Sequence, residues 1–244
     1  GETVAIGARF HDGDTNALKN AGHVRVFAAS GISIAQTGTT DGFGNLLTTE
    51  AGSTSTFTVV LDAKPTADVN VTLTGADSTE HSLSTSSLTF TTSNWNTAQT
   101  VTVTGVDDNI DDGDITTTLT ATASNSGGYA GTETATATLK TSDNDNSGIT
   151  IAQTGTTDGS GNLLTTEAGS TSTFTVVLDA KPTADVNVSI TGADSTEHSL
   201  STSSLTFTTS NWDTAQTVTV TGVDDSLDDG DITTTLTATA SNSG

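Results

Sequence analysis

The chain has 244 residues and a formal net charge of −23, with 29 acidic side chains against six lysines and arginines and no cysteine. Nucleic acids and anionic membrane surfaces are poor partners for such a chain, because both are bound through basic patches, whereas cations are favourable partners. The absence of cysteine excludes disulfides, thiolate metal sites and cysteine nucleophiles. No apolar run approaches the ~18 residues that a membrane-spanning helix needs.

Residues 1–30 differ in composition from the rest of the chain. They contain three acidic and three basic side chains, so the whole acidic excess lies after them, and residues 4–8 (VAIGA) and 23–27 (HVRVF) are predicted to be two short strands. Through AIGA at residues 5–8 and GHVRVF at residues 22–27, the stretch resembles the end of an FG-GAP repeat, the blade unit of integrin-type β-propellers. The family's Asp-x-Asp-x-Asp-Gly loop precedes this stretch and is not in the chain. The resemblance implies a propeller upstream, and we expect the chain to be an excerpt of a longer protein.

The remainder of the chain is an internal repeat. Residues 31–127 recur as residues 148–244, at an offset of 117, with seven differences over 97 aligned positions. The differing pairs are Ser33/Thr150, Phe43/Ser160, Thr72/Ser189, Leu73/Ile190, Asn96/Asp213, Asn109/Ser226 and Ile110/Leu227. A long regular period marks a tandem array. We therefore predict one domain at residues 31–147, a second at 148–244 that lacks its last strand, and a short acidic junction at residues 143–148 (DNDNSG).

Each repeat has a β pattern, because apolar residues alternate with Thr and Ser and no stretch keeps a 3.6-residue apolar period. The seven strands predicted for the first repeat are residues 32–37, 54–61, 68–74, 86–91, 99–104, 115–123 and 132–140. Turns rich in Gly, Asp, Ser and Asn separate them. This pattern predicts an all-β fold of tandem antiparallel seven-stranded sandwiches. We expect Trp95 and Trp212 to fill the core or cap its end.

The acids of the first repeat concentrate in four connections between these strands. They are Glu50, the pair Asp77 and Glu80, the run of residues 107–114 (DDNIDDGD), and Asp143 with Asp145. Successive strands of an antiparallel sandwich usually reverse direction, so alternate connections fall at the same end. All four groups are therefore expected to meet at one pole of the domain.

Carboxylates gathered in this way repel one another and destabilise the fold unless they are neutralised. Few cationic side chains are available, and Ca²⁺ is the natural counterion because it takes six to eight oxygen ligands. Without Cys, and with only four His, a zinc or copper site is not expected. The run is not an EF-hand loop, because Asp112 stands where that loop needs Gly. The alternative interpretation is a solvated acidic surface that binds no specific ion.

The first repeat contains, in order, TEAG at residues 49–52, LTF at 88–90, NWN at 94–96, VDD at 106–108, DGD at 112–114 and SDND at 142–145. Through these motifs each repeat resembles the Calx-beta domain, the immunoglobulin-like calcium module of sodium/calcium exchangers, integrin β4 and many bacterial surface proteins. The resemblance implies immunoglobulin-like sandwiches that bind calcium. In the first repeat the implied ligands are Glu50, Glu80, Asp107, Asp108, Asp111, Asp112, Asp114, Asp143 and Asp145. In the second repeat they are Glu167, Glu197, Asp224, Asp225, Asp228, Asp229 and Asp231.

Two departures from the family concern this ligand set. Glu80 stands where the family usually has Asp, and the run at residues 107–114 is spaced about one residue differently, so the choice among Asp111, Asp112 and Asp114 stays open. The sequence DNDN at residues 143–146 is also similar to the cadherin calcium linker, but the Asp-Arg-Glu triplet of that family is missing.

The abundant Ser and Thr lie on alternating strands, where they are common on solvent faces, so we expect no catalysis within this chain. The expected function is a calcium-binding structural array in a large secreted or cell-surface bacterial protein, an adhesin, with Ca²⁺ stiffening the junction between repeats. Its expected partners are calcium, neighbouring repeats, and a host or cell-surface ligand bound by domains outside the chain. The alternative is a non-catalytic spacer module of a secreted enzyme.

Overall fold

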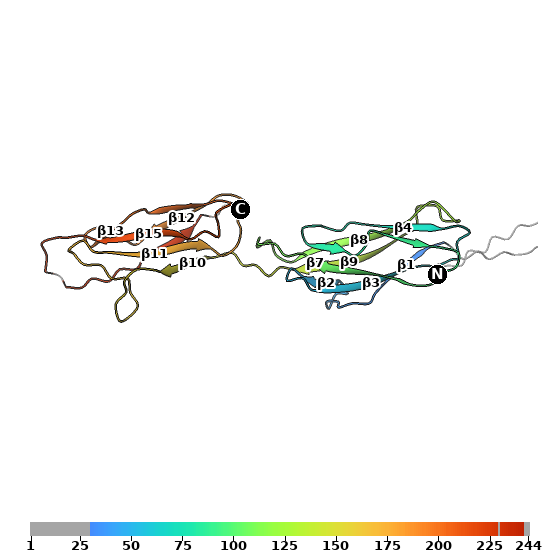
Figure 1. Cartoon of the computed structure of the whole chain (residues 1–244), viewed down its shortest axis with the longest axis horizontal. Coiled ribbons are helices and arrows are strands. Elements are labelled where there is room, and N and C mark those ends of the chain that lie inside the picture. Colours follow the sequence, from blue (N-terminus) through green and yellow to red (C-terminus); the bar gives the residue numbers. More distant parts are fainter. Residues whose placement is uncertain (1–29, 229, 242–244) are drawn as a thin grey trace, which may run out of the picture. The chain divides into compact units, whose positions relative to one another are not determined.

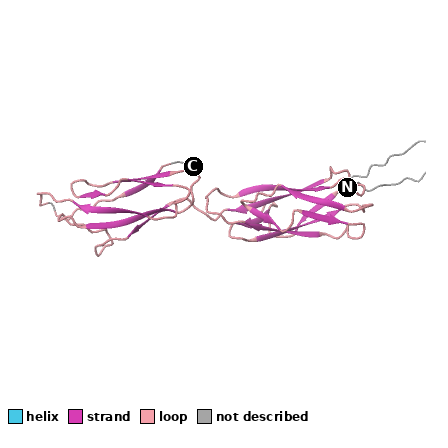
Figure 2. Ribbon diagram, turned by 45° about the horizontal axis from the view of Figure 1, so that its top comes forward, coloured by secondary structure: helices cyan, strands magenta, loops and turns pink. Residues whose placement is uncertain are grey.

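The computed structural model describes residues 30–228 and 230–241. The strands expected at residues 4–8 and 23–27, and the candidate ligand Asp229, lie outside the described residues. Every regular element in the described part is a strand (Figure 2), which confirms the all-β prediction. No helix within these ranges is long and apolar enough to cross a membrane. The chain forms two compact units, of which the first contains β1 to β9 and the second β10 to β16.

The first domain consists of two sheets (Figure 1). One sheet has, in spatial order, β1 (Ile32–Gln36), β3 (Thr54–Leu61), β7 (Gln99–Gly105) and β5 (His81–Leu83). The other has β2 (Leu46–Thr49), β9 (Thr134–Ser142), β8 (Ile115–Ala123), β4 (Val69–Thr74) and β6 (Ser87–Phe90). All seven predicted strands are present, and those at residues 54–61 and 115–123 have the predicted bounds.

The core of this domain lies between the two sheets. The alternation of the sequence places every second side chain inside, so β3 buries Phe57, Val59 and Leu61 while the Thr and Val side chains between them are partly exposed. Phe90 faces the same core from the other sheet and is fully buried. Trp95 is partly buried and packs against this cluster, as the sequence predicted.

Two strands of the first domain were not predicted, β2 and β5. Strand β2 pairs in parallel with β9, with Leu46 opposite Leu139 and Thr49 opposite Ser142. The pairing of the other strands is antiparallel. Strand β5 joins the edge of β7, with His81 opposite Gly105. Both strands are short, and each exists through pairing with a strand far away in the sequence.

The second domain has fewer strands in the described residues than the first, and none of them corresponds to β9. One sheet has β10 (Ile149–Gln153), β11 (Thr171–Leu178), β15 (Gln216–Gly222) and β13 (His198–Leu200), and the other has β14 (Ser204–Phe207), β12 (Val186–Thr191) and β16 (Thr237–Ala240). Residues 163–166 have the sequence of β2 but form no strand. Residues 232–240 have the sequence of β8, but only Thr237–Ala240 forms a strand, which pairs with β12. The predicted domain boundary, between residues 147 and 148, lies in the segment that joins β9 to β10, and it stays a prediction.

Candidate metal centre

Five acidic side chains of the first repeat come together in space. Glu50 directly follows β2, Glu80 directly precedes β5, Asp112 lies between β7 and β8, and Asp143 and Asp145 follow β9. Carboxylate oxygens of Glu50, Glu80 and Asp112 lie within 4.8 Å of one another, and so do those of Glu50, Asp143 and Asp145. Glu50 belongs to both groups and joins them. We call these five residues the acidic cluster; all of them are among the ligands predicted from the sequence.

The two glutamates of the acidic cluster are almost inaccessible to solvent. Glu50 is 1% exposed and Glu80 is 3% exposed, whereas Asp143 and Asp145 are half-buried and Asp112 is exposed. Burying a carboxylate is costly unless a compensating charge accompanies it. Two unit charges 4.8 Å apart repel by about 3.5 kcal/mol at an effective dielectric constant of about 20. The charge of the acidic cluster therefore favours a cation, and the atoms that it offers to one are all carboxylate oxygens.

Backbone hydrogen bonds hold the two glutamates in place. The Glu50 N–H donates to the Ser142 carbonyl oxygen (3.1 Å), which attaches Glu50 to the end of β9. The Val106 N–H donates to the Glu80 carbonyl oxygen (2.8 Å), which attaches Glu80 to the residue after β7. The position of Glu50 is therefore linked to the last residue of β9.

A glycine allows the close approach of two strand ends beside Glu50. A Cβ atom built on Gly105, the last residue of β7, would collide with the Thr49 carbonyl oxygen at the end of β2. Only glycine at this position lets the backbone before Glu50 lie so close to β7.

The loops around the acidic cluster are joined by their own carboxylates. Asp143 accepts a hydrogen bond from the Gly113 N–H (2.7 Å), and Asp111 accepts one from the Ser147 N–H (2.7 Å). The hydrogen bonds from Ser147 lower the pKa of the Asp111 carboxyl. These contacts tie the loop between β7 and β8 to the segment after β9.

The pKa of Asp112 is affected by the negative charges around it. Although the Asp112 side chain is exposed, partial desolvation of its carboxyl first, and then the charges of Asp108, Asp143 and Asp111, raise its pKa. A nearby cation would reverse this shift, because an opposite charge stabilises the ionised carboxylate.

The remaining ligands predicted in the first repeat lie outside the acidic cluster. Asp108 accepts a hydrogen bond from the Ile110 N–H (2.7 Å), as in an Asx turn. Asp114 forms an ion pair with Lys140, with 2.6 Å between the carboxylate oxygen and Nζ. Neither group of close carboxylates includes Asp107, Asp108, Asp111 or Asp114. Their roles as ligands stay predictions.

The second repeat does not assemble the same cluster within the described residues, although its sequence is nearly identical. Glu167, the counterpart of Glu50, is exposed, and Glu197, the counterpart of Glu80, is half-buried. Six predicted ligands of this repeat lie within the described residues, and none belongs to either group of close carboxylates. They are Glu167, Glu197, Asp224, Asp225, Asp228 and Asp231. Within the described residues, no strand pairs with residues 163–166 in the way that β9 pairs with β2.

His81, which the sequence analysis assigned no role, belongs to the surroundings of the acidic cluster. Its side chain is 1% exposed, and its Nε2 accepts a hydrogen bond from the Asp77 N–H (3.4 Å) and lies 3.4 Å from the Thr117 hydroxyl. Within the described part of the chain, Nδ1 has no hydrogen-bond partner. Burial lowers the pKa of His81, and the charge of Asp77 partly offsets this effect. A neutral His81 thus links the loop before β5 to β8.

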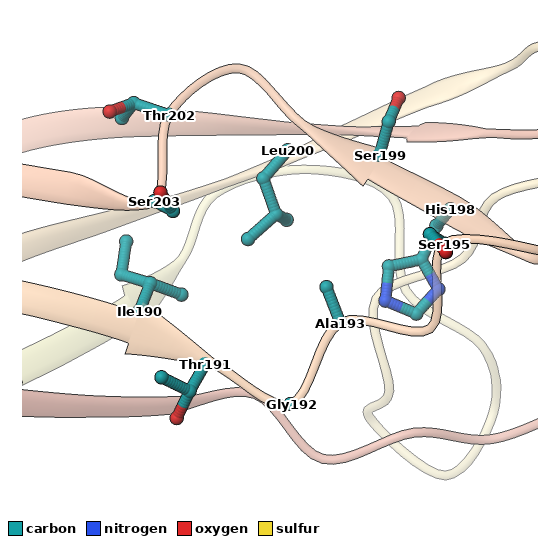
Figure 3. A pocket seen from close by; sticks show the side chains of 10 residues that line it. All are labelled: Ile190, Thr191, Gly192, Ala193, Ser195, His198, Ser199, Leu200, Thr202 and Ser203. Atoms are coloured by element: carbon teal, nitrogen blue, oxygen red, sulfur yellow. The ribbon is translucent and has the colours of Figure 1, made fainter.

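The second domain also contains an open hollow between the end of β12 and the turn from β13 to β14. Figure 3 shows Ile190, Ala193 and Leu200 directed into it, and its volume is about 610 Å³. His198 is the one titratable side chain that lines it, and His198 Nε2 lies 3.2 Å from the Thr234 hydroxyl. The lining has no carboxylate to orient a histidine base, so it does not supply a catalytic triad.

Comparisons with known proteins give the following results. No protein-family model matches the chain, and no curated protein matches its sequence. Among solved structures it is similar to CBD12 from CALX1.2 (15% identity, 84% of this chain and 79% of that chain, TM-score 0.32) and to the calcium binding domain CBD12 of CALX1.1 (16%, 76% and 74%, TM-score 0.33). It is also similar to the E. coli chaperone DraB (8%, 80% and 87%, TM-score 0.31). Likenesses at these TM-scores carry no argument about family or ligand, so the Calx-beta and FG-GAP resemblances remain expectations from the sequence.

Proposed function

We propose that the chain is a calcium-binding structural repeat array and that its first repeat holds Ca²⁺ in the acidic cluster. The observation that carries this proposal is the convergence of the buried Glu50 and Glu80 with three further carboxylates. Two oxygens that bind one Ca²⁺ at about 2.4 Å are at most about 4.8 Å apart. The carboxylate spacing in the acidic cluster is therefore compatible with a shared ion.

The ligand types favour Ca²⁺ over other common metals. Zinc and copper sites are usually built from His or Cys, and the two groups of close carboxylates contain neither. Mg²⁺ requires near-ideal octahedral geometry and keeps several waters, which suits a cluster of five carboxylates less well than the flexible coordination of Ca²⁺. Extracellular calcium modules bind with Kd values of about 10⁻⁴–10⁻³ M, and we expect an affinity in this range.

The proposed role of the ion is mechanical. Ca²⁺ neutralises the acidic cluster, orders the loops at residues 107–114 and 143–147, and stiffens the junction between successive repeats. Near-identical tandem repeats and the charge of −23 support a non-catalytic array in a large secreted or cell-surface bacterial protein, with adhesion carried out by domains outside this chain.

Isothermal titration of the whole chain with CaCl₂ and, separately, with MgCl₂ tests this function. We expect saturable Ca²⁺ binding with submillimolar to millimolar affinity and at least tenfold weaker binding of Mg²⁺. Equal responses to the two ions would refute the metal assignment and leave an acidic surface adapted to salt.

A further inference from the structure

The chain enters and leaves the first domain at opposite ends of one strand, β9. At the entry, the Ser30 hydroxyl donates a hydrogen bond to the Glu133 carboxylate (2.7 Å), and Glu133 directly precedes β9. At the exit, the chain leaves from Ser142, the last residue of β9. Nine residues of strand lie between these two points, which is a length of about 30 Å. A tensile load on the polypeptide on either side of this domain therefore acts along the axis of β9.

Two neighbouring strands hold β9 against such a load. Strand β8 pairs antiparallel with β9 over eight residue pairs. On the other side, β2 pairs with β9 in parallel, from Leu46 opposite Leu139 to Thr49 opposite Ser142. β9 therefore lies inside the sheet between two partners, and moving it along its own axis slides it past both.

The parallel direction of β2 and β9 decides how this pair is loaded. Tension from the N-terminal side first shears β1 from β3, over five residue pairs, and then draws β2 toward its own first residue. Tension from the C-terminal side draws β9 toward its last residue. Because the two strands point the same way, they are pulled in opposite directions along a common axis. The hydrogen bonds of the pair then bear the load together, whereas a force across the strands opens them one after another.

Buried contacts reinforce the pair near its C-terminal end. Thr48 and Thr141 are 0% and 1% exposed, and their hydroxyl oxygens lie 3.1 Å apart across the two strands. The Glu50 N–H continues the pairing after β2 by donating to the Ser142 carbonyl oxygen (3.1 Å). Water has little access to the two threonine hydroxyls, so no solvent partner replaces their contact as the strands begin to slide.

We propose that the first domain is a load-bearing module, and that the pair of β2 and β9 is a shear clamp that resists extension of the chain. The clamp consists of strand pairing and buried side chains, so it needs no ligand. Resistance to tension is a function beyond ion binding. It suits a tandem array, because force along such a chain passes through every domain in turn.

The acidic cluster adds a second step, which rests on the proposed function. Glu50 directly follows β2, and Asp143 and Asp145 follow β9. Carboxylate oxygens of these three residues lie within 4.8 Å of one another, so an ion that they share links the ends of the two clamp strands. Sliding of β9 along β2 then separates ligands of one ion as well as hydrogen bonds. Calcium should therefore raise the force at which the clamp opens.

The test pulls the whole chain in an optical trap through pairs of introduced cysteines, which are unique attachment points because the chain has no cysteine. Phe43→Cys with Asn146→Cys loads the clamp in shear, because residue 43 precedes β2 and residue 146 follows β9. Ala51→Cys with Asn146→Cys is the matched control. It loads the same pair across the strands, because both attachment points follow the aligned ends Thr49 and Ser142. All three substituted side chains are exposed.

In chelator, we expect the unfolding force to be at least about twofold higher for the shear pair than for the control pair at the same loading rate. Urea unfolding should give both variants the stability of the parent chain, so that a difference in force reports the direction of the load. Equal unfolding forces for the two pairs, or a lower force in shear, would overturn the clamp.

The calcium step is read separately. At about 10 mM free Ca²⁺ the shear force should rise about 1.5-fold over its value in chelator, and Asp143→Asn in the shear variant should remove this rise. A shear force that exceeds the control force in chelator but does not respond to Ca²⁺ would contradict the calcium function and leave the clamp established.

Discussion

Replacing Glu50 by Gln is expected to change stability in opposite directions with and without calcium. Gln has nearly the same size and shape as Glu but carries no charge. Glu50 is 1% exposed and belongs to both groups of close carboxylates, so its charge is repelled by up to four neighbours. Each ionised pair costs about 3.5 kcal/mol at an effective dielectric constant of about 20. Solvent screening at the exposed Asp112 reduces this cost, and we expect Glu50→Gln to stabilise the first domain in chelator by about 2 kcal/mol.

Calcium that binds only the folded state stabilises the parent chain by an amount set by the Kd and the free calcium concentration. At 10 mM free Ca²⁺ and a Kd of about 10⁻⁴–10⁻³ M, binding to the folded state stabilises by about 1.4–2.7 kcal/mol. For a domain of roughly 110 residues this raises the Tm by about 5–10 °C. The Glu50→Gln variant loses a central ligand, and its Tm should rise by less than about 2 °C when calcium is added.

Glu167→Gln is the matched control, because it makes the same change at the same position of the second repeat. Glu167 is exposed and belongs to neither group of close carboxylates, so this substitution should alter neither the Tm in chelator nor the response to calcium. The chain has two tryptophans, Trp95 in the first domain and Trp212 in the second, so a Trp212→Phe background lets fluorescence follow the first domain alone. Similar behaviour of the two Gln variants would refute the argument that burial and convergence make Glu50 a ligand.

Three further predictions concern the framework around the acidic cluster. Leu46→Ala should destabilise the first domain by about 3 kcal/mol and Leu163→Ala the second by less than about 1 kcal/mol in chemical unfolding, because Leu46 is 0% exposed and Leu163 only partly buried. Gly105→Ala should cost about 2 kcal/mol and weaken calcium binding in a titration, because the added Cβ displaces the backbone before the first buried glutamate. Hydrogen bonding, first of all from the Ala130 N–H, lowers the pKa of Glu133 from 4.5 to about 2, so the resulting stability is present above pH 4.5 and is lost as the pH falls toward 2. Urea unfolding between pH 2 and 7 should therefore show a flatter acid limb for Glu133→Gln, with a loss of about 1 kcal/mol at pH 7 after allowance for solvent screening.

Local pattern was sufficient to predict the strands that carry the core. In β3 and β8 a period of two extends over eight or nine residues, and the structure gives both the predicted bounds. Strand β2 was not predicted because its four residues, LLTT, are too short to show a period. The same four letters form no strand at residues 163–166. The presence of β9, and not the local sequence, decides between the two structures.

The candidate site, like the fold, could be predicted from the sequence only in part. The order of strands was enough to predict that the acids near Glu50, Glu80, Asp112 and Asp143 would meet, because alternate connections of an antiparallel sandwich share one end. It could not predict which residues of the run at 107–114 would approach the glutamates. That choice depends on loop hydrogen bonds such as the one from the Ser147 N–H to Asp111, which have no counterpart in the strand pattern.

A comparison of the two repeats distinguishes the effect of the local sequence around a site residue from the effect of the neighbouring strands. Glu50 and Glu167 lie in the same run, TTEAG, yet one is 1% exposed beside four carboxylates and the other is exposed. What differs is β9, which pairs with the strand before Glu50, accepts the Glu50 N–H through Ser142, and continues into two of the five acids. One strand thus lies against the residue that carries the buried Glu50 carboxylate and continues into two further acids of the acidic cluster. We therefore expect insertion of that strand and assembly of the acidic cluster to be a single cooperative step, and any condition that opens β9 should also release the calcium that we propose binds there.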